Sequence, residues 1–150
     1  MIRDFEFFHG AALARLVHAG GRLTMGSFRE ASRAAYVVND ECGLYLKHSS
    51  SRMSPWQFTF LRRHQDEVDR LRVVTERLVV GFVCNDDGVV GLTYSELRMV
   101  LDSNFEEIEG VSISRSPRGM YIVRGRDGEM RYRVAEGYFI RKVLGVRQEG

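Results

Sequence analysis

The spacing of apolar residues changes along the chain, and each change marks a predicted element. Over residues 8–17, apolar positions such as Phe8 and Leu16 recur on one side at helical spacing. Gly20 and Gly21 follow, and glycine commonly stands just beyond the end of a helix. The pattern therefore predicts a first helix that ends before this glycine pair.

Three short segments with strand character come next. Residues 36–38 and 44–47 are rich in β-branched and aromatic side chains, and the turn-forming residues 39–43 separate them. This arrangement predicts a hairpin. Residues 56–60 then alternate Trp and Phe with Gln and Thr, which predicts a third strand with one apolar face.

A second change of period follows this strand. Residues 61–75 carry an apolar stripe at helical spacing, and charged side chains fill the rest of the helix surface. Residues 77–85 are almost all apolar, as is typical of a strand covered on both faces. A turn at 85–88 leads into a further strand at 89–93.

The remaining segments complete the predicted order. Thr93 and Glu96 form a capping-box pattern that opens a helix over 94–102. Three strands separated by polar turns predict an antiparallel β-meander over 111–116, 120–125 and 130–137. Helices interleaved with strands predict an α/β fold, with α+β as the alternative, in which helices pack on a mixed sheet.

The length of 150 residues is typical of one domain, and we predict a single domain over 1–150. Within it, we expect an α/β core over 1–105 and a C-terminal β extension over 110–150. No apolar run approaches the roughly 18 residues that span a bilayer, and the first residues lack the pattern of a signal peptide. These features predict a cytoplasmic protein without a membrane partner.

The two cysteines, Cys42 and Cys84, have no CxxC pattern and no neighbouring histidine. They favour unreactive thiols in a reducing compartment over a disulfide scaffold. The four histidines show no paired spacing, and the turn at 85–88 accounts for its two aspartates. We therefore predict no metal site and no cofactor.

The segment after the hairpin carries the first candidate chemistry. Lys47 ends an apolar strand, and after His48 come three serines and Arg52. A lysine ammonium and an arginine guanidinium beside hydroxyl groups can hold a phosphate. A solvated strand end followed by a polar loop explains the same residues without a ligand.

The order of elements around Lys47 resembles the core of the PD-(D/E)xK nuclease superfamily, which has a restriction-endonuclease-like fold. In that family a Glu-x-Lys strand and an earlier aspartate bind Mg²⁺, and the lysine steadies the phosphate. Aligning GLYLK with this motif matches Lys47 to the family lysine, while Tyr45 takes the glutamate position. The earlier aspartate position falls near Ser32 or Arg33. The resemblance therefore implies a nuclease-like core that lacks its metal-binding carboxylates.

The segments LYLKHS and SPW.FTF also resemble those of an uncharacterised bacterial protein family. We therefore expect a bacterial protein, and this second resemblance implies no activity.

The charge is unevenly distributed along the chain. The net charge is +2, but residues 115–150 hold nine basic residues against four acidic ones, while residues 1–114 hold 13 against 16. A basic strip can follow a phosphate backbone. The candidate anion-binding residues in this segment are Arg115, Arg118, Arg124, Arg131 and Arg133.

Two features of this segment favour different explanations. Arg131 and Arg133 flank Tyr132 on a predicted strand, so that their side chains would share a face. The acidic segment 106–109 could instead neutralise the strip, and a solvated sheet rich in arginine is the alternative without a ligand.

These features favour a binding or accessory module with a degenerate nuclease-like core that contacts nucleic acid or another polyanion through Lys47, Arg52 and the C-terminal arginines. The first alternative is an active nuclease that uses Mg²⁺ as cofactor and takes its carboxylates from Glu30, Asp40 or Glu41. The second is a protein-interaction domain or homodimer that pairs through an edge of the C-terminal meander.

Overall fold

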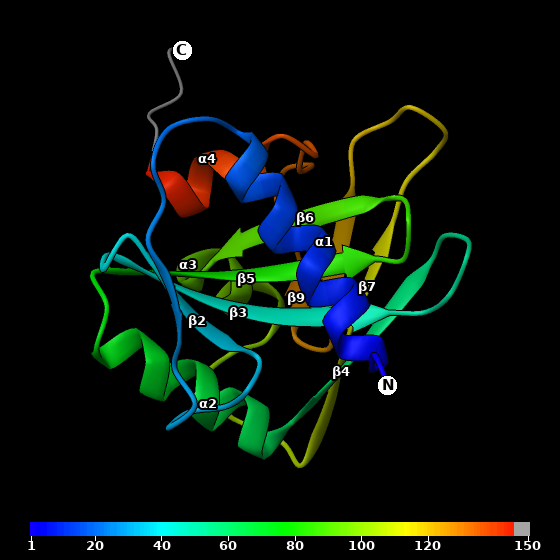
Figure 1. The fold of residues 1–150 in the computed structure, drawn as a ribbon. Helices are drawn as coiled ribbons and strands as arrows, with labels where there is room; N and C mark the ends of the chain where they lie inside the picture. The colour runs from blue at the N-terminus through cyan, green and yellow to red at the C-terminus, as the bar shows by residue number, and fades with distance from the viewer. Residues whose placement is uncertain (146–150) are drawn as a thin grey trace.

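The computed structural model describes residues 1–145, which form two sheets and four helices (Figure 1). The first sheet is mixed, with the strand order β1 (Met25–Ser27), β2 (Ala35–Val38), β3 (Cys42–Ser49), β5 (Arg77–Cys84) and β6 (Gly88–Thr93). The second sheet is antiparallel, with the order β4 (Trp56–Leu61), β7 (Ile108–Ser114), β8 (Ile122–Gly125) and β9 (Gly128–Glu129). The helices are α1 (Asp4–His18), α2 (Arg62–Val73), α3 (Tyr94–Val100) and α4 (Tyr138–Leu144).

The first sheet is mixed because β3 and β5 are parallel while its other neighbouring strands are antiparallel. Parallel neighbours require a long connection, and here that connection contains β4 and α2. The register places Lys47 opposite Phe82 in β5. On the other side of β3, pairing with β2 stops at Tyr45, which leaves the last part of β3 without a paired strand at that edge.

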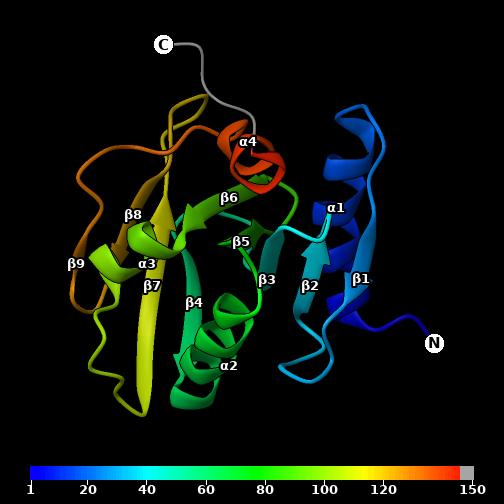
Figure 2. The same ribbon diagram turned by 90° about the vertical axis from the view of Figure 1, so that its left-hand side faces the viewer.

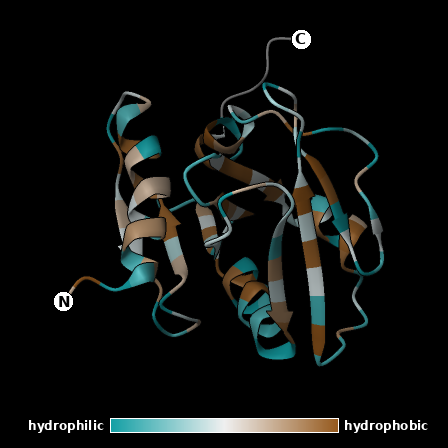
Figure 3. Cartoon of the chain, turned by 90° about the vertical axis from the view of Figure 1, so that its right-hand side faces the viewer, coloured by the Kyte–Doolittle hydropathy of each residue, from teal (hydrophilic) through white to brown (hydrophobic). Residues whose placement is uncertain are grey.

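Both faces of the first sheet are covered, as the apolar run of β5 predicts. Helices α1 and α4 pack on one face, where Leu16 and Phe139 join the buried cluster. Helices α2 and α3 and the second sheet cover the other face (Figure 2), where Phe58 and Leu71 are buried. In Figure 3 teal and brown positions both occur along α2, in agreement with its predicted apolar stripe.

The alternation predicted for the third strand is confirmed. Trp56, Phe58 and Phe60 are buried, while Gln57 and Thr59 are exposed. The structure shows that this strand belongs to the second sheet, where it pairs with β7. Its apolar face packs against the first sheet, and Phe58 meets Phe82 at a ring-centroid distance of 4.9 Å.

Several predicted boundaries are corrected. The first helix begins at Asp4, four residues before the predicted start, and β1 was not predicted at all. The strand predicted over 130–137 is wrong, because these residues are irregular apart from one bridge between Val134 and Tyr121. Helix α4 follows instead, since Phe139 and Val143 lie one turn apart and pack into the core beside α1.

The absence of a strand at 130–137 changes where the predicted basic side chains lie. Arg131 and Arg133 lie in the irregular segment after β9, so they do not share the face of a strand. The predicted extension over 110–150 and its basic count include Arg147, which lies outside the described residues. Within residues 1–145, no helix has both the length and the apolar character needed to cross a bilayer.

Candidate functional site

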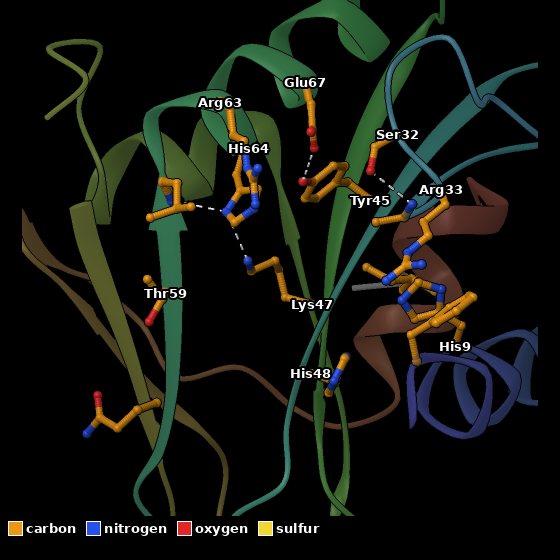
Figure 4. Close-up of a pocket in the computed structure, with 15 residues that line it drawn as sticks. His9, Ser32, Arg33, Tyr45, Lys47, His48, Thr59, Arg63, His64 and Glu67 are labelled. Atoms are coloured by element: carbon orange, nitrogen blue, oxygen red, sulfur yellow. Dashed lines mark hydrogen bonds between the residues drawn. The ribbon is translucent and has the colours of Figure 1, made fainter. Parts of the chain in front are cut away.

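A cavity of about 540 Å³ opens where the unpaired end of β3 meets the start of α2 (Figure 4). Side chains from β4, from the loop before β2 and from the first half of α1 complete its wall. Most of its charged or ionisable groups are basic. The titratable residues that line it are His9, Arg33, Tyr45, Lys47, His48, Arg63, His64 and Glu67.

Lys47 lies between an imidazole and an aromatic ring. Its Nζ lies 3.3 Å from Nδ1 of His64 and 4.9 Å from the centre of the Phe60 ring. Burial is the main cause that lowers the pKa of Lys47 to about 8, and Arg63 lowers it further while Glu67 acts in the opposite direction. Lys47 therefore exists partly as a neutral amine near physiological pH.

The orientation of His64 follows from its place in the first turn of α2. Its Nδ1 accepts the backbone N–H of Leu61 at 3.0 Å and so caps the helix. An atom that accepts this bond carries no proton, so the proton of the neutral imidazole is on Nε2. Burial and the neighbouring Lys47 lower the pKa of His64, which favours this neutral form.

Tyr45 and Glu67 line the cavity and are joined by a hydrogen bond. The Tyr45 hydroxyl donates a hydrogen bond of 2.6 Å to Oε2 of Glu67, and Tyr45 itself is buried. Burial, followed by the bond to Glu67, raises the pKa of Tyr45, so the phenol keeps its proton. Among the described residues that line the cavity, Glu67 supplies the one carboxylate, and it is already held by this bond.

The side of the cavity beside α1 has two neutral histidines. Nδ1 of His9 lies 2.9 Å from the Tyr36 hydroxyl, and burial is the main cause that lowers the pKa of His9 to about 4. His48 stacks on Phe8 with ring centroids 4.6 Å apart, and burial lowers its pKa as well. These rings therefore present neutral donors and acceptors near pH 7.

Arg33 and Arg63 supply the fixed positive charge. The guanidinium of Arg33 lies 4.2 Å from the centre of the Phe5 ring, which holds it beside the opening. Arg63 stands in the first turn of α2, where the positive end of the helix dipole adds to its charge. Together with Lys47 they make the cavity a strongly cationic environment that can hold an anion.

The structure separates the residues that the sequence proposed as one site. Lys47 lines the cavity, whereas Arg52 is exposed in the segment between β3 and β4. The serines after Lys47 stabilise this segment through backbone contacts and do not line the cavity. The Ser51 carbonyl accepts the indole N–H of Trp56 at 2.9 Å. The Asn85 amide likewise donates to the Ser50 carbonyl at 3.0 Å.

The C-terminal arginines have different environments. Arg115 is largely buried, with its guanidinium 2.8 Å from Asp87 and stacked over the Tyr121 ring, so it supports the fold. Arg118 is exposed in the turn between β7 and β8, where its φ of 62° marks a tight reversal. A hollow of about 300 Å³ gathers the other three predicted arginines, which are Arg124, Arg131 and Arg133.

A groove that contains one of these arginines lies next to the cavity. This groove, of about 380 Å³, runs over the open face of the second sheet and is lined by Arg124 and Arg126. Gln57 and Thr59 of β4 line both the groove and the cavity. Both arginines are half or more exposed, although Arg124 contacts Glu129 and Arg126 contacts Glu106.

Sequence reasoning missed Arg33, Arg63, His64 and Glu67. Arg63 and His64 share one local signal, because the strand period changes directly to a helical period at Leu61, whereas Glu67 lies a turn farther along α2. A helix that begins without a loop places its first-turn side chains beside the end of the preceding strand. Arg33 carries no such signal, since its place depends on how the loop before β2 folds over the cavity.

The carboxylates proposed for a nuclease do not meet at Lys47. Asp40 and Glu41 lie in the turn before β3, six or more residues along the chain from Lys47, or about 20 Å along an extended strand. Glu41 pairs there with Arg77 at 3.2 Å, and Glu30 lies outside the cavity lining. Within residues 1–145, no group of three or more histidine, cysteine or acidic side chains could hold a metal ion.

The two cysteines are buried with free thiols, as the sequence predicts. Burial raises the pKa of Cys42 to about 11 and also raises the pKa of Cys84, so both thiols stay protonated.

Comparison with protein-family models, with curated proteins and with solved structures gives no match to this chain.

Proposed function

We propose that this protein is a binding module for phosphate-bearing ligands, nucleic acid among them, and that the cavity around Lys47 is its binding site. One observation carries the proposal. Lys47, Arg33 and Arg63 reach the same cavity from three different elements, and the single carboxylate of the lining is bound to Tyr45. Such a concentration of positive charge in a concave site favours an anion.

The donor types fit a phosphate group in particular. A guanidinium such as that of Arg63 can bind two phosphate oxygens, while Lys47 acts as a point charge. The hydroxyls of Ser32 and Thr59 also line the cavity and can donate to the remaining oxygens. The volume of about 540 Å³ lies in the range of small-molecule sites, so it can admit more than a bare phosphate.

The groove over the second sheet supports a longer polyanion. It shares Gln57 and Thr59 with the cavity, and Arg124, Arg126 and Glu109 also line it. A single strand of nucleic acid with one phosphate near Lys47 would meet these arginines farther along its backbone. DNA and RNA share this backbone charge, so the proposal covers both.

The likeness to the PD-(D/E)xK nuclease superfamily is part of this proposal. In that family the third strand carries Glu-x-Lys, and β1 makes β3, which holds Lys47, the third strand of the first sheet, so the position of Lys47 supports the likeness. Tyr45 replaces the family glutamate, and Glu67 brings one carboxylate to the same place from α2. One carboxylate is a poor Mg²⁺ site, so binding without cleavage is the favoured function.

The proposal is tested by titrating labelled single-stranded DNA and RNA oligonucleotides at low salt. We expect Lys47→Gln and Arg63→Gln each to weaken binding by about tenfold, because each removes a charged contact. Arg22→Gln is the matched control, since Arg22 is exposed beyond the C-terminal end of α1, and α1 runs about 13 Å from His9 in the cavity wall to that end. We also expect the affinity of the unchanged protein to fall steeply as salt rises.

Two results would overturn the proposal. The first is the absence of any oligonucleotide or pyrophosphate binding at low ionic strength. The second is an equal loss of affinity in Arg22→Gln and Lys47→Gln, which would indicate nonspecific attraction to net charge.

The same samples test the alternatives from the sequence. Cleavage of the oligonucleotide in Mg²⁺ or Mn²⁺ that Lys47→Ala abolishes would favour an active nuclease. A stable dimer that persists after nuclease treatment would favour a protein-interaction domain. The bacterial origin and the cytoplasmic location stay predictions.

A further inference from the structure

Lys47 differs from the other lysine of the chain, Lys142, in its partners. Nζ of Lys142 lies 2.8 Å from a carboxylate oxygen of Glu96 and donates to the Gly91 carbonyl at 2.8 Å. Lys47 has no such ion pair among the described residues, and its nearest acceptor is Nδ1 of a neutral imidazole. That acceptor already receives the N–H of Leu61. The ammonium form of Lys47 is therefore weakly supported.

Burial is the largest of the effects that act on the pKa of Lys47, and it lowers that pKa. Arg63, which faces Lys47 from α2, lowers it further, while His64 of α2 and His48 of β3 line the same cavity. Glu67 opposes them, but its Oε2 is bound by Tyr45. The pKa of about 8 gives Lys47 a neutral fraction near pH 7 that is roughly 300-fold larger than that of an exposed lysine.

A neutral amine in an open cavity is a nucleophile. The apolar ring of Phe60 lies against Nζ, and Arg33 and Arg63 line the same cavity and can hold an anionic group of a bound molecule. This combination places an amine and an anion site within one volume of about 540 Å³. Desolvated lysines of this kind react with carbonyl groups.

We propose that Lys47 forms an imine with a carbonyl compound that carries a phosphate or similar anionic group. The lone pair of Nζ attacks the carbonyl carbon, and a proton passes from nitrogen to oxygen through solvent to give a carbinolamine. Loss of one water molecule then leaves a C=N bond, so the net reaction joins an amine and a carbonyl and releases water. No oxidant or reductant is needed. The statement that the carbonyl compound carries a phosphate or similar anionic group rests on the proposed function.

The experiment uses pyridoxal 5′-phosphate as an aldehyde probe and pyridoxal as its counterpart without phosphate. Borohydride reduction fixes the imine, and peptide mapping compares the two lysines. We expect Lys47 to be modified about tenfold faster than Lys142, and faster with the phosphate ester than with pyridoxal. Inorganic phosphate should compete with the ester, and Arg63→Gln should slow its reaction.

The variant Lys47→Arg tests the imine alone. It lacks the amine, so it should lose the adduct at this position, while the affinity of the unchanged protein for oligonucleotide tests the proposed function separately. Lys142→Arg is the matched control and should retain the adduct on Lys47.

Each contrary result has one meaning. Modification of Lys47 no faster than that of Lys142 overturns the imine, and oligonucleotide binding then decides the proposed function by itself. Rapid modification of Lys47 with equal rates for pyridoxal and its phosphate keeps the nucleophile and overturns the anion site.

Discussion

The Tyr45 hydroxyl donates a 2.6 Å hydrogen bond to Oε2 of Glu67, and this bond joins β3 to α2 across 22 residues of sequence. It holds the carboxylate at the phenol, while Nζ of Lys47 lies at His64 (Figure 4). The phenol thus occupies the place where the resemblance implies a metal-binding glutamate, and it controls how a nearby carboxylate is used.

Removing this hydrogen bond should destabilise the fold and change the cavity. We expect Tyr45→Phe to lower the free energy of unfolding by about 1–2 kcal/mol, because Glu67 loses a donor beside a buried ring. Urea denaturation measures this change. The double variant with Glu67→Gln should lose less than the two single variants together. Strictly additive losses would contradict an energetic link between the two side chains.

Burial of Lys47 should reduce stability in a way that depends on pH. Its pKa is lower in the fold than in the unfolded chain, so the unfolded state binds more protons between about pH 8 and pH 10.5, and stability rises with pH there. Lys47→Met should therefore be more stable than the unchanged protein at pH 7, by on the order of 1–2 kcal/mol. Denaturation at pH 7 and pH 9.5 should show this advantage shrinking. A constant difference would contradict the shifted pKa.

His9 should make the fold sensitive to acid. Its pKa falls from 6.5 to about 4 on folding, so the unfolded state binds more protons in this window and stability decreases as pH falls through it. Between pH 7 and pH 4 we expect the free energy of unfolding to fall by about 2 kcal/mol or more, and His9→Gln should reduce this loss. His18→Gln is the matched control, because His18 is exposed.

The buried carboxylate of Glu96 should be essential for the docking of α4. Burial by itself would raise the pKa of Glu96, but hydrogen bonds from Lys142 and Tyr132 and from the Thr93 backbone hold it below its usual value. Glu96→Ala leaves Lys142 without its partner, and we expect a loss of about 3 kcal/mol. The less severe Thr93→Ala, which removes only the cap of α3, should lose about 1 kcal/mol. Equal losses would contradict the role of the ion pair.

Much of the fold follows from local patterns. The apolar run of β5, the alternation of β4 and the Thr93–Glu96 capping box all form as the sequence predicts, because each depends on neighbours within a few residues. The strand predicted over 130–137 fails for the opposite reason. Its apolar residues are few, and α4 is stabilised by packing on distant strands rather than by a long helical pattern.

The sequence by itself determined a mixed α/β fold, two unreactive thiols and the singular position of Lys47 at the end of a strand. Only the tertiary structure decided which side chains surround that lysine. Arg33, Arg63 and Glu67 come from a loop and a helix that meet β3 in space, and Arg115 is withdrawn from the surface by Asp87. Such contacts depend on the pairing and packing of whole elements, which local periodicity does not encode.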